Sequence, residues 1–216
     1  DTQGGAALAS RLDWAADLHP ERAPRAAERR WLERQQNFTA DSSKCWQELR
    51  GNVEKTRAAL AKLLRTRAVN NVVFSTGTLG ALQLLTQAFG MTREESILFP
   101  GDEIVVTDCE FPILYELLCR RYTLKIAPIG RCSNPRELTD AVMSVITHNT
   151  RLAFFSHVLY RTGLLLPLGQ ISDAVKTLSP DILVAVDGSQ AVGQVDVNLA
   201  REHCDFYMGD THKWLQ

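Results

Sequence analysis

The stretch from Leu152 to Asp187, LAFFSHVLYRTGLLLPLGQISDAVKTLSPDILVAVD, contains two apolar runs on either side of a helical segment. The runs are Leu152–Val158 and Ile182–Asp187, and the helical segment covers residues 168–178, directly after Pro167. Strands that are apolar on both faces and separated by a helix are typical of a parallel sheet covered by helices on both sides. The stretch therefore predicts an α/β fold.

The same alternation continues on both sides of this stretch, between residues 72 and 208. The further predicted strands are Val72–Ser75, Ile104–Asp108, Leu124–Pro128 and Cys204–Met208, and the further predicted helices lie near 78–89, 112–121 and 135–147. We expect a doubly wound α/β domain with a mostly parallel sheet flanked by helices. The ligands of such sheets lie beyond the carboxyl ends of the strands, so we expect the chemically important residues there.

Two more helices are predicted before the first strand. Residues 24–38 begin with Pro24 and are rich in helix formers, and residues 45–65 carry an apolar stripe at helical spacing. This stripe is expected to pack on the core or on another subunit, and it consists of Trp46, Leu49, Val53, Leu60, Leu63 and Leu64. Residues 1–23 are expected to form an N-terminal segment, and residues 24–216 one large domain.

The composition excludes several classes of protein. The 216 residues are 45% hydrophobic and 23% charged, which is typical of a folded globular protein. A net charge of -1 removes the basic excess that nucleic-acid binding requires, and no apolar run approaches the roughly 18 residues of a membrane span. Five cysteines without a CxxC pair indicate neither a disulfide framework nor a zinc site. We expect a cytoplasmic protein with a small-molecule site and no metal.

The run VVFSTGTLGALQLL, residues 72–85, predicts a strand, a Gly-containing turn and a helix. Such a turn leaves the backbone N–H groups of Gly77, Thr78 and Leu79 at a positive helix end, with the Thr78 hydroxyl beside them. This arrangement suits a phosphate group. A capped helix without a ligand is the alternative, and the run has neither the GxGxxG spacing of a dinucleotide site nor the GK[ST] ending of a P-loop.

Two strand ends carry a carboxylate and an amine. Asp187 ends an apolar strand, where a carboxylate needs a cationic or donor partner, and a pyridinium N–H is such a partner. Lys213 follows the strand Cys204–Met208 and could attack an aldehyde from there. A solvated surface lysine is the alternative. In the segment GDEIVVTDCEFP, Phe111 could lie over a flat ring or belong to the core.

The segments DGSQAVGQVDVN and CDFYMGDTHKWL resemble the signature of the class V aminotransferase family of fold type I enzymes, which depend on pyridoxal 5′-phosphate (PLP). The family includes cysteine desulfurases and isopenicillin N epimerase-like proteins. The resemblance extends over roughly residues 24–216 and includes GDEIVVTDCEFP and SHVLYRTGLLLPL. It implies that residues 24–216 are the large, PLP-binding domain of such an enzyme.

The resemblance also implies a role for each matching residue. Lys213 would form the Schiff base with the cofactor, and Asp187 would pair with its pyridine nitrogen. Gln190 would approach the phenolic oxygen of the cofactor, and Phe111 would stack on its ring. The phosphate would be held by the turn and by one further side chain, a set that consists of Gly77, Thr78, Leu79 and His212.

Three positions depart from the pattern of the desulfurases. Asp210 stands where they have a phosphate-binding Ser, and because a carboxylate beside a phosphate is unfavourable, we expect Asp210 to point away or the phosphate to be held by fewer groups. Tyr160 replaces an Asn, and Leu79 replaces a second Thr. These departures argue against a housekeeping desulfurase.

The implied function is that of an enzyme acting on an amino acid or amine, with transamination, epimerisation, C–S lysis and desulfuration left open. The alternative is a non-catalytic domain with an interaction role. Relatives continue beyond the position of Lys213 into a small C-terminal domain, which we expect to be missing from this chain. We therefore expect a homodimer, and a chain that is inactive without a partner or its missing part.

Overall fold

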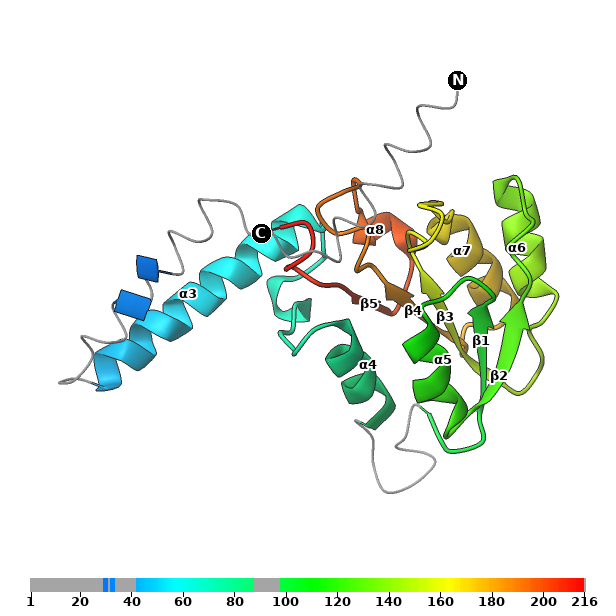
Figure 1. Ribbon diagram of the computed structural model, residues 1–216, viewed down its shortest axis with the longest axis horizontal. Coiled ribbons are helices and arrows are strands. Elements are labelled where there is room, and N and C mark those ends of the chain that lie inside the picture. The colour runs from blue at the N-terminus through cyan, green and yellow to red at the C-terminus, as the bar shows by residue number, and fades with distance from the viewer. Residues whose placement is uncertain (1–28, 31, 34–41, 88–97, 216) are drawn as a thin grey trace.

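The computed structural model describes residues 29–30, 32–33, 42–87 and 98–215. Its centre is a five-stranded sheet in the order β2-β1-β3-β4-β5, and every pair of neighbouring strands is parallel (Figure 1). The strands are β1 (Glu103–Thr107), β2 (Thr123–Ala127), β3 (Thr150–Ser156), β4 (Leu183–Asp187) and β5 (Phe206–Met208). The predicted α/β fold with a parallel sheet is confirmed.

Helices cover both faces of the sheet and create two apolar cores. The helices are α3 (Ser42–Leu63), α4 (Thr78–Gln87), α5 (Pro112–Cys119), α6 (Pro135–Met143), α7 (Leu168–Leu178) and α8 (Leu199–Glu202), with a short 3-10 helix, η1 (Val69–Asn71). α6 and α7 pack on one face, where Phe155 and Val184 are fully buried. α4 and α5 pack on the other face, where Phe154 and Ala185 are fully buried. This alternation explains why the central strands are apolar on both faces.

The helix at residues 168–178 was predicted with its observed bounds, and the other strands and helices of the sheet region lie within a few residues of their predicted positions. The run Val72–Ser75 is different, because it is not a strand. Val72 is extended, but the run belongs to no strand, and Val73 is 75% exposed. The Val72 carbonyl accepts a hydrogen bond from the Arg57 guanidinium and not from the backbone of a neighbouring strand. The residues of the run suit a strand, but no strand among the described residues pairs with it.

α3 extends away from the sheet (Figure 1). Trp46 is 61% exposed and Leu63 is 46% exposed, so the expectation that their stripe packs on the core is wrong for these two residues. Ala61, near the end of the helix, is buried. Packing of the stripe on another subunit stays a prediction. The helix predicted at 24–38 lies mostly outside the described residues, and the segment 1–23 lies entirely outside them.

Within the part of the chain that the structure describes, no helix combines the length and the apolar character needed to cross a membrane.

Candidate functional site

The carboxyl ends of β4 and β5 bring Asp187 and Lys213 into one region. Asp187 is the last residue of β4 and lies in register with Met208, the last residue of β5. Lys213 follows β5 in a turn, and its side chain is 23% exposed. Burial raises the pKa of Asp187, and hydrogen bonds from Ser189 and the charge of Lys213 only partly oppose this effect. The site therefore holds a carboxylate that would gain from a further cationic donor.

The predicted phosphate cup lies beside these residues. α4 begins at Thr78, and Gly77 before it has a φ of +97°, which favours glycine. The Thr78 hydroxyl lies 2.6 Å from the Ser189 hydroxyl. The Thr78 N–H donates to Asp210 Oδ1 at 2.9 Å. The sequence analysis expected this N–H to be available for a phosphate, and here it is already bonded to a carboxylate.

Asp210 thus points into the cup. The first alternative, that it points away, is wrong, and the second, that fewer groups hold the phosphate, stays a prediction. Two positive partners account for this orientation. One is the N-terminal end of α4, and the other is the Lys213 ammonium, whose Nζ lies 3.4 Å from Asp210 Oδ2. Burial acts to raise the pKa of Asp210, but the Thr78 N–H and the charges of Lys213 and His212 outweigh it, and the pKa is lowered. The carboxylate is therefore ionised in the cup.

Two further predicted site residues, Phe111 and Gln190, contact aromatic neighbours. Phe111 precedes α5, is 41% exposed, and makes an edge contact with Tyr160 at 5.3 Å between ring centroids. Gln190 Oε1 accepts a hydrogen bond of 3.1 Å from the Trp214 indole N–H. Both contacts join residues on different loops, so they fix the positions of side chains that the sequence identified only by motif.

Sequence reasoning assigned no role to Glu110, which is 2% exposed beside the site. Its carboxylate accepts the Ser156 N–H and hydroxyl and, at 2.7 Å, the Thr107 hydroxyl. Burial raises its pKa to about 7, these hydrogen bonds act to lower it, and the nearby Asp187 charge raises it further. Glu110 joins the ends of β1 and β3 next to Asp187. An acidic residue three positions after the end of β1 was the available signal, although its partner on β3 cannot be seen in the sequence.

We expect Glu110→Gln to reduce the pH dependence of stability. Because the pKa of Glu110 in the folded protein is about 7 and its ordinary value is 4.5, its protonation contributes stability that is complete below pH 4.5 and is lost as the pH rises through 7. Glutamine stays neutral, so the free energy of unfolding should fall less over this window. Urea unfolding at several pH values measures the free energy of unfolding. Glu116→Gln, at an exposed position on α5, is the control. Its free energy of unfolding should decrease over this pH range as much as that of the unaltered protein.

His157 is a second buried group that the sequence analysis did not single out. Its Nδ1 lies 2.8 Å from the Tyr207 hydroxyl, and burial lowers its pKa to about 4, so the ring is neutral. The Tyr207 ring lies so close to Gly188 that a Cβ at this position would clash with it. The hydrogen bond and the ring contact hold the ends of β3, β4 and β5 together around Asp187.

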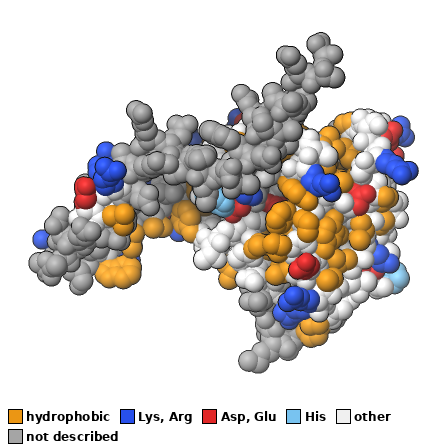
Figure 2. Space-filling view, viewed as in Figure 1, with side chains coloured by type: hydrophobic (Ala, Val, Ile, Leu, Met, Phe, Trp, Pro, Cys, Tyr) orange, Lys and Arg blue, Asp and Glu red, His pale blue; other side chains and the backbone are white. Residues whose placement is uncertain are grey.

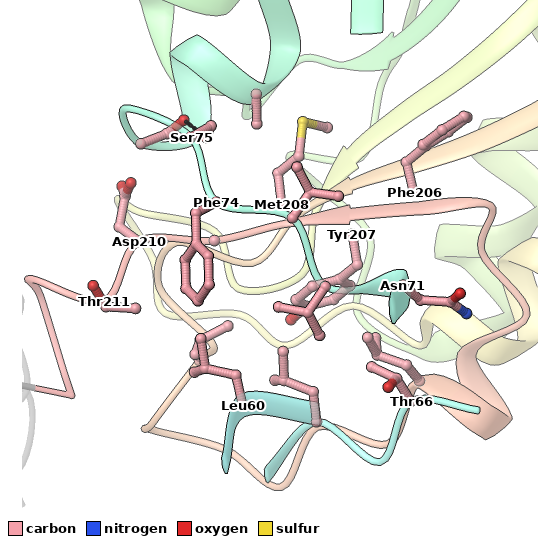
Figure 3. Close-up of a pocket in the computed structure, with 18 of the residues that line it drawn as sticks. Leu60, Thr66, Asn71, Phe74, Ser75, Phe206, Tyr207, Met208, Asp210 and Thr211 are labelled. Carbon is pink, nitrogen blue, oxygen red and sulfur yellow. Dashed lines mark hydrogen bonds between the residues drawn. The ribbon is translucent and has the colours of Figure 1, made fainter. Parts of the chain in front are cut away.

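A cavity of about 600 Å³ borders the cup on the side of α3 and α4. Its wall is mostly apolar, and Figure 3 shows Asp210 and Ser75 near one end of it, with Phe74 between them and Leu60. Asp187, Lys213, Gln190 and Phe111 do not line this cavity. The cavity therefore borders the site only at the predicted phosphate cup.

Comparisons with known proteins match this architecture. A family model described as aminotransferase class-V matches residues 14–215. An isopenicillin N epimerase from Amycolatopsis lactamdurans is 33% identical over 74% of this chain and 40% of its own length. A cysteine desulfurase from Dickeya dadantii is 29% identical over 74% of this chain and 38% of its own length. The chain thus spans about two fifths of these relatives.

Solved structures share the fold. The cystine C–S lyase C-DES in complex with cysteine persulfide superposes with a TM-score of 0.80 at 22% identity, over 93% of this chain and 52% of that chain. A C-DES mutant with glycine covalently linked to its PLP cofactor gives a TM-score of 0.73 at 24% identity, over 85% of this chain and 47% of that chain. The likeness establishes the large-domain fold of fold type I PLP enzymes.

Proposed function

The chain belongs to the class-V aminotransferase family, whose cofactor is PLP, and from this premise we propose that it changes bonds at the α-carbon of an amino acid or a related amine. The observation that carries the proposal is the convergence of Asp187 and Lys213 at the ends of two adjacent parallel strands. An acid for a ring nitrogen and an amine for an aldehyde are the two protein groups this chemistry needs.

The described residues fit the ring of the cofactor. The pKa of Asp187 is raised by burial, so a pyridinium N–H would stabilise its charged form. Phe111 exposes 41% of its surface next to the site and could stack on a flat ring. Lys213 would bind the aldehyde carbon, and Gln190 would lie beside the phenolic oxygen. Thr78, with Gly77, Leu79 and His212, would hold the phosphate once Asp210 has moved.

When bound, PLP supplies an electron-withdrawing ring conjugated to its aldehyde carbon, which weakens the bonds at the α-carbon of an attached amine. Asp187 keeps a proton on the ring nitrogen and so maintains this withdrawal. The Lys213 amine would carry a proton to or from the α-carbon. Phe111 shields one face of the ring from water, and Gln190 orients the phenolic oxygen.

Removal of the α-proton is common to transamination and epimerisation, and the 33% identical relative is an epimerase. We therefore propose α-proton transfer as the first step to test. A non-catalytic role is not favoured, because Lys213, Asp187 and Gln190 are all present.

The decisive experiment is a hydrogen-exchange screen. The purified protein is loaded with PLP and incubated with single amino acids in D2O, and deuterium at the α-carbon is followed by NMR. Exchange that depends on both PLP and Lys213 supports the proposal. The absence of a PLP-dependent absorbance change and of exchange with every amino acid would contradict it.

The proposed active form is a homodimer, and α3 offers an uncovered apolar surface for it. Figure 2 shows hydrophobic side chains exposed along α3, and Trp46 is among the most exposed of them. We expect Trp46→Glu to lower the measured mass from dimer to monomer in sedimentation, because a charge in an apolar interface is unfavourable. Leu178→Glu, at a 58% exposed position at the end of α7, is the control and should leave the mass unchanged.

A further inference from the structure

Asp210 occupies the position at which the phosphate of the cofactor is expected. One carboxylate oxygen accepts the Thr78 N–H at 2.9 Å, and the other lies 3.4 Å from Lys213 Nζ. Asp210 is 8% exposed, so these partners replace water around its charge. A Cβ on Gly77 would come within 3.0 Å of Asp210 Oδ1, which shows how closely the carboxylate approaches the turn.

We propose that Asp210 acts as an internal substitute for the phosphate group and that it determines how much the phosphate contributes to cofactor binding. The inference rests on the proposed cofactor site. It makes Asp210 a specificity-determining residue that reduces the preference of the site for a phosphorylated cofactor over its unphosphorylated form.

The physical basis is that two anions compete for one set of donors. A phosphate at the N-terminal end of α4 needs the Thr78 N–H and hydroxyl, and the Asp210 carboxylate already holds the first of these. Unless the carboxylate moves, the two negative charges repel each other across a partly buried site.

Movement of Asp210 also has a cost. It gives up the hydrogen bond from the Thr78 N–H, the ion pair with Lys213 and the favourable charge of His212. The phosphate must compensate for all of these losses before it adds affinity. Part of the binding free energy of the phosphate is therefore used to displace Asp210.

Pyridoxamine 5′-phosphate and pyridoxamine are suitable probes, because they differ only in the phosphate and neither has an aldehyde that could react with Lys213. Calorimetric titration gives a dissociation constant for each probe. The dissociation constant of pyridoxamine divided by that of pyridoxamine 5′-phosphate measures the contribution of the phosphate to binding. The ratio is compared among the unaltered protein, Asp210→Asn and Asp210→Ser. Asp196→Asn is the control, because Asp196 pairs with Arg65 on the surface, outside the cup.

We expect the ratio to rise by about tenfold or more in both Asp210 variants, which corresponds to the removal of one like charge from the cup, and to stay unchanged in Asp196→Asn. An unchanged or smaller ratio in the Asp210 variants would show that the carboxylate does not compete, and would overturn the inference while leaving the proposed function intact.

The unaltered protein provides a second measurement that needs no variant to fold. If Asp210 did not occupy the cup, the phosphate would form several charge-assisted hydrogen bonds there, and the ratio of the two dissociation constants would be above about a thousandfold. We expect a ratio below about a hundredfold, and a larger one overturns the inference. If neither probe binds to any of the proteins, the inference and the proposed function fail together.

Discussion

Borohydride reduction of the PLP-loaded protein is expected to fix the cofactor on Lys213, and Lys213→Ala is expected to remove this label completely. The position of Lys213 supports the expectation, since it follows β5 in a turn close to Asp187 and its side chain is only 23% exposed. Loss of the amine also removes the proposed proton carrier, so turnover should fall by about 10²- to 10⁴-fold. Peptide mass mapping of the reduced protein and the α-proton exchange assay measure the two effects.

The matched control is Lys55→Ala, which removes an exposed lysine from α3 and keeps a good helix former there. It should retain both the label and the turnover. Recovery of the label on another lysine of the unaltered protein would contradict the assignment of Lys213. Residual covalent labelling in Lys213→Ala at the level of the unaltered protein would contradict it as well.

Asp187→Asn is expected to leave PLP bound but to slow α-proton exchange on the order of 10²- to 10³-fold, the range found when a preorganised charge or donor is removed from an active site. An amide cannot hold the ring nitrogen in its protonated form, so electron withdrawal weakens while the shape of the site is kept. Asparagine Oδ1 can still accept the Ser189 N–H, which now donates to Asp187 at 2.8 Å. Unchanged exchange in this variant would rule out the proposed role.

The stability of the cofactor-free protein gives an independent test of the same residue. The pKa of Asp187 is raised by burial, so its ionisation lowers the stability of the fold as the pH rises above 3.8 and through the raised value. Asp187→Asn should therefore be at least as stable as the unaltered protein at neutral pH. Asp181→Asn, at an exposed position before β4, should leave both stability and exchange unchanged. Thermal unfolding measures the difference.

Local pattern was sufficient to predict most of the fold. Central strands such as β3 and β4 are apolar on both faces because helices cover both sides of the sheet, and this pattern is visible in the sequence. The helix after Pro167 was predicted for the same reason, since its start signal is local. Asp187 and Lys213 were found because polar residues at the ends of parallel strands converge at one edge of the sheet.

Other features depend on partners that are distant in the sequence. The predicted strand at residues 72–75 has suitable residues, but within the part of the chain that the structure describes no strand pairs with it, and pairing is a property of the whole sheet. Glu110 has a partner nearby in the sequence, because it accepts a hydrogen bond from the Thr107 hydroxyl. It also accepts the Ser156 N–H, 46 positions away, and this bond connects the ends of β1 and β3. Neither outcome could be read from a local pattern.

The sequence by itself determined the parallel α/β sheet, the family resemblance, and the positions of Asp187 and Lys213, because each depends on periodicity or on a contiguous motif. The tertiary structure alone decided the direction of Asp210. Its carboxylate meets the Thr78 N–H across 132 positions of sequence, where the packing of α4 beside β5 brings a positive helix end to it. A buried charge turns toward the partners that best replace its water, and only the folded chain brings those partners together.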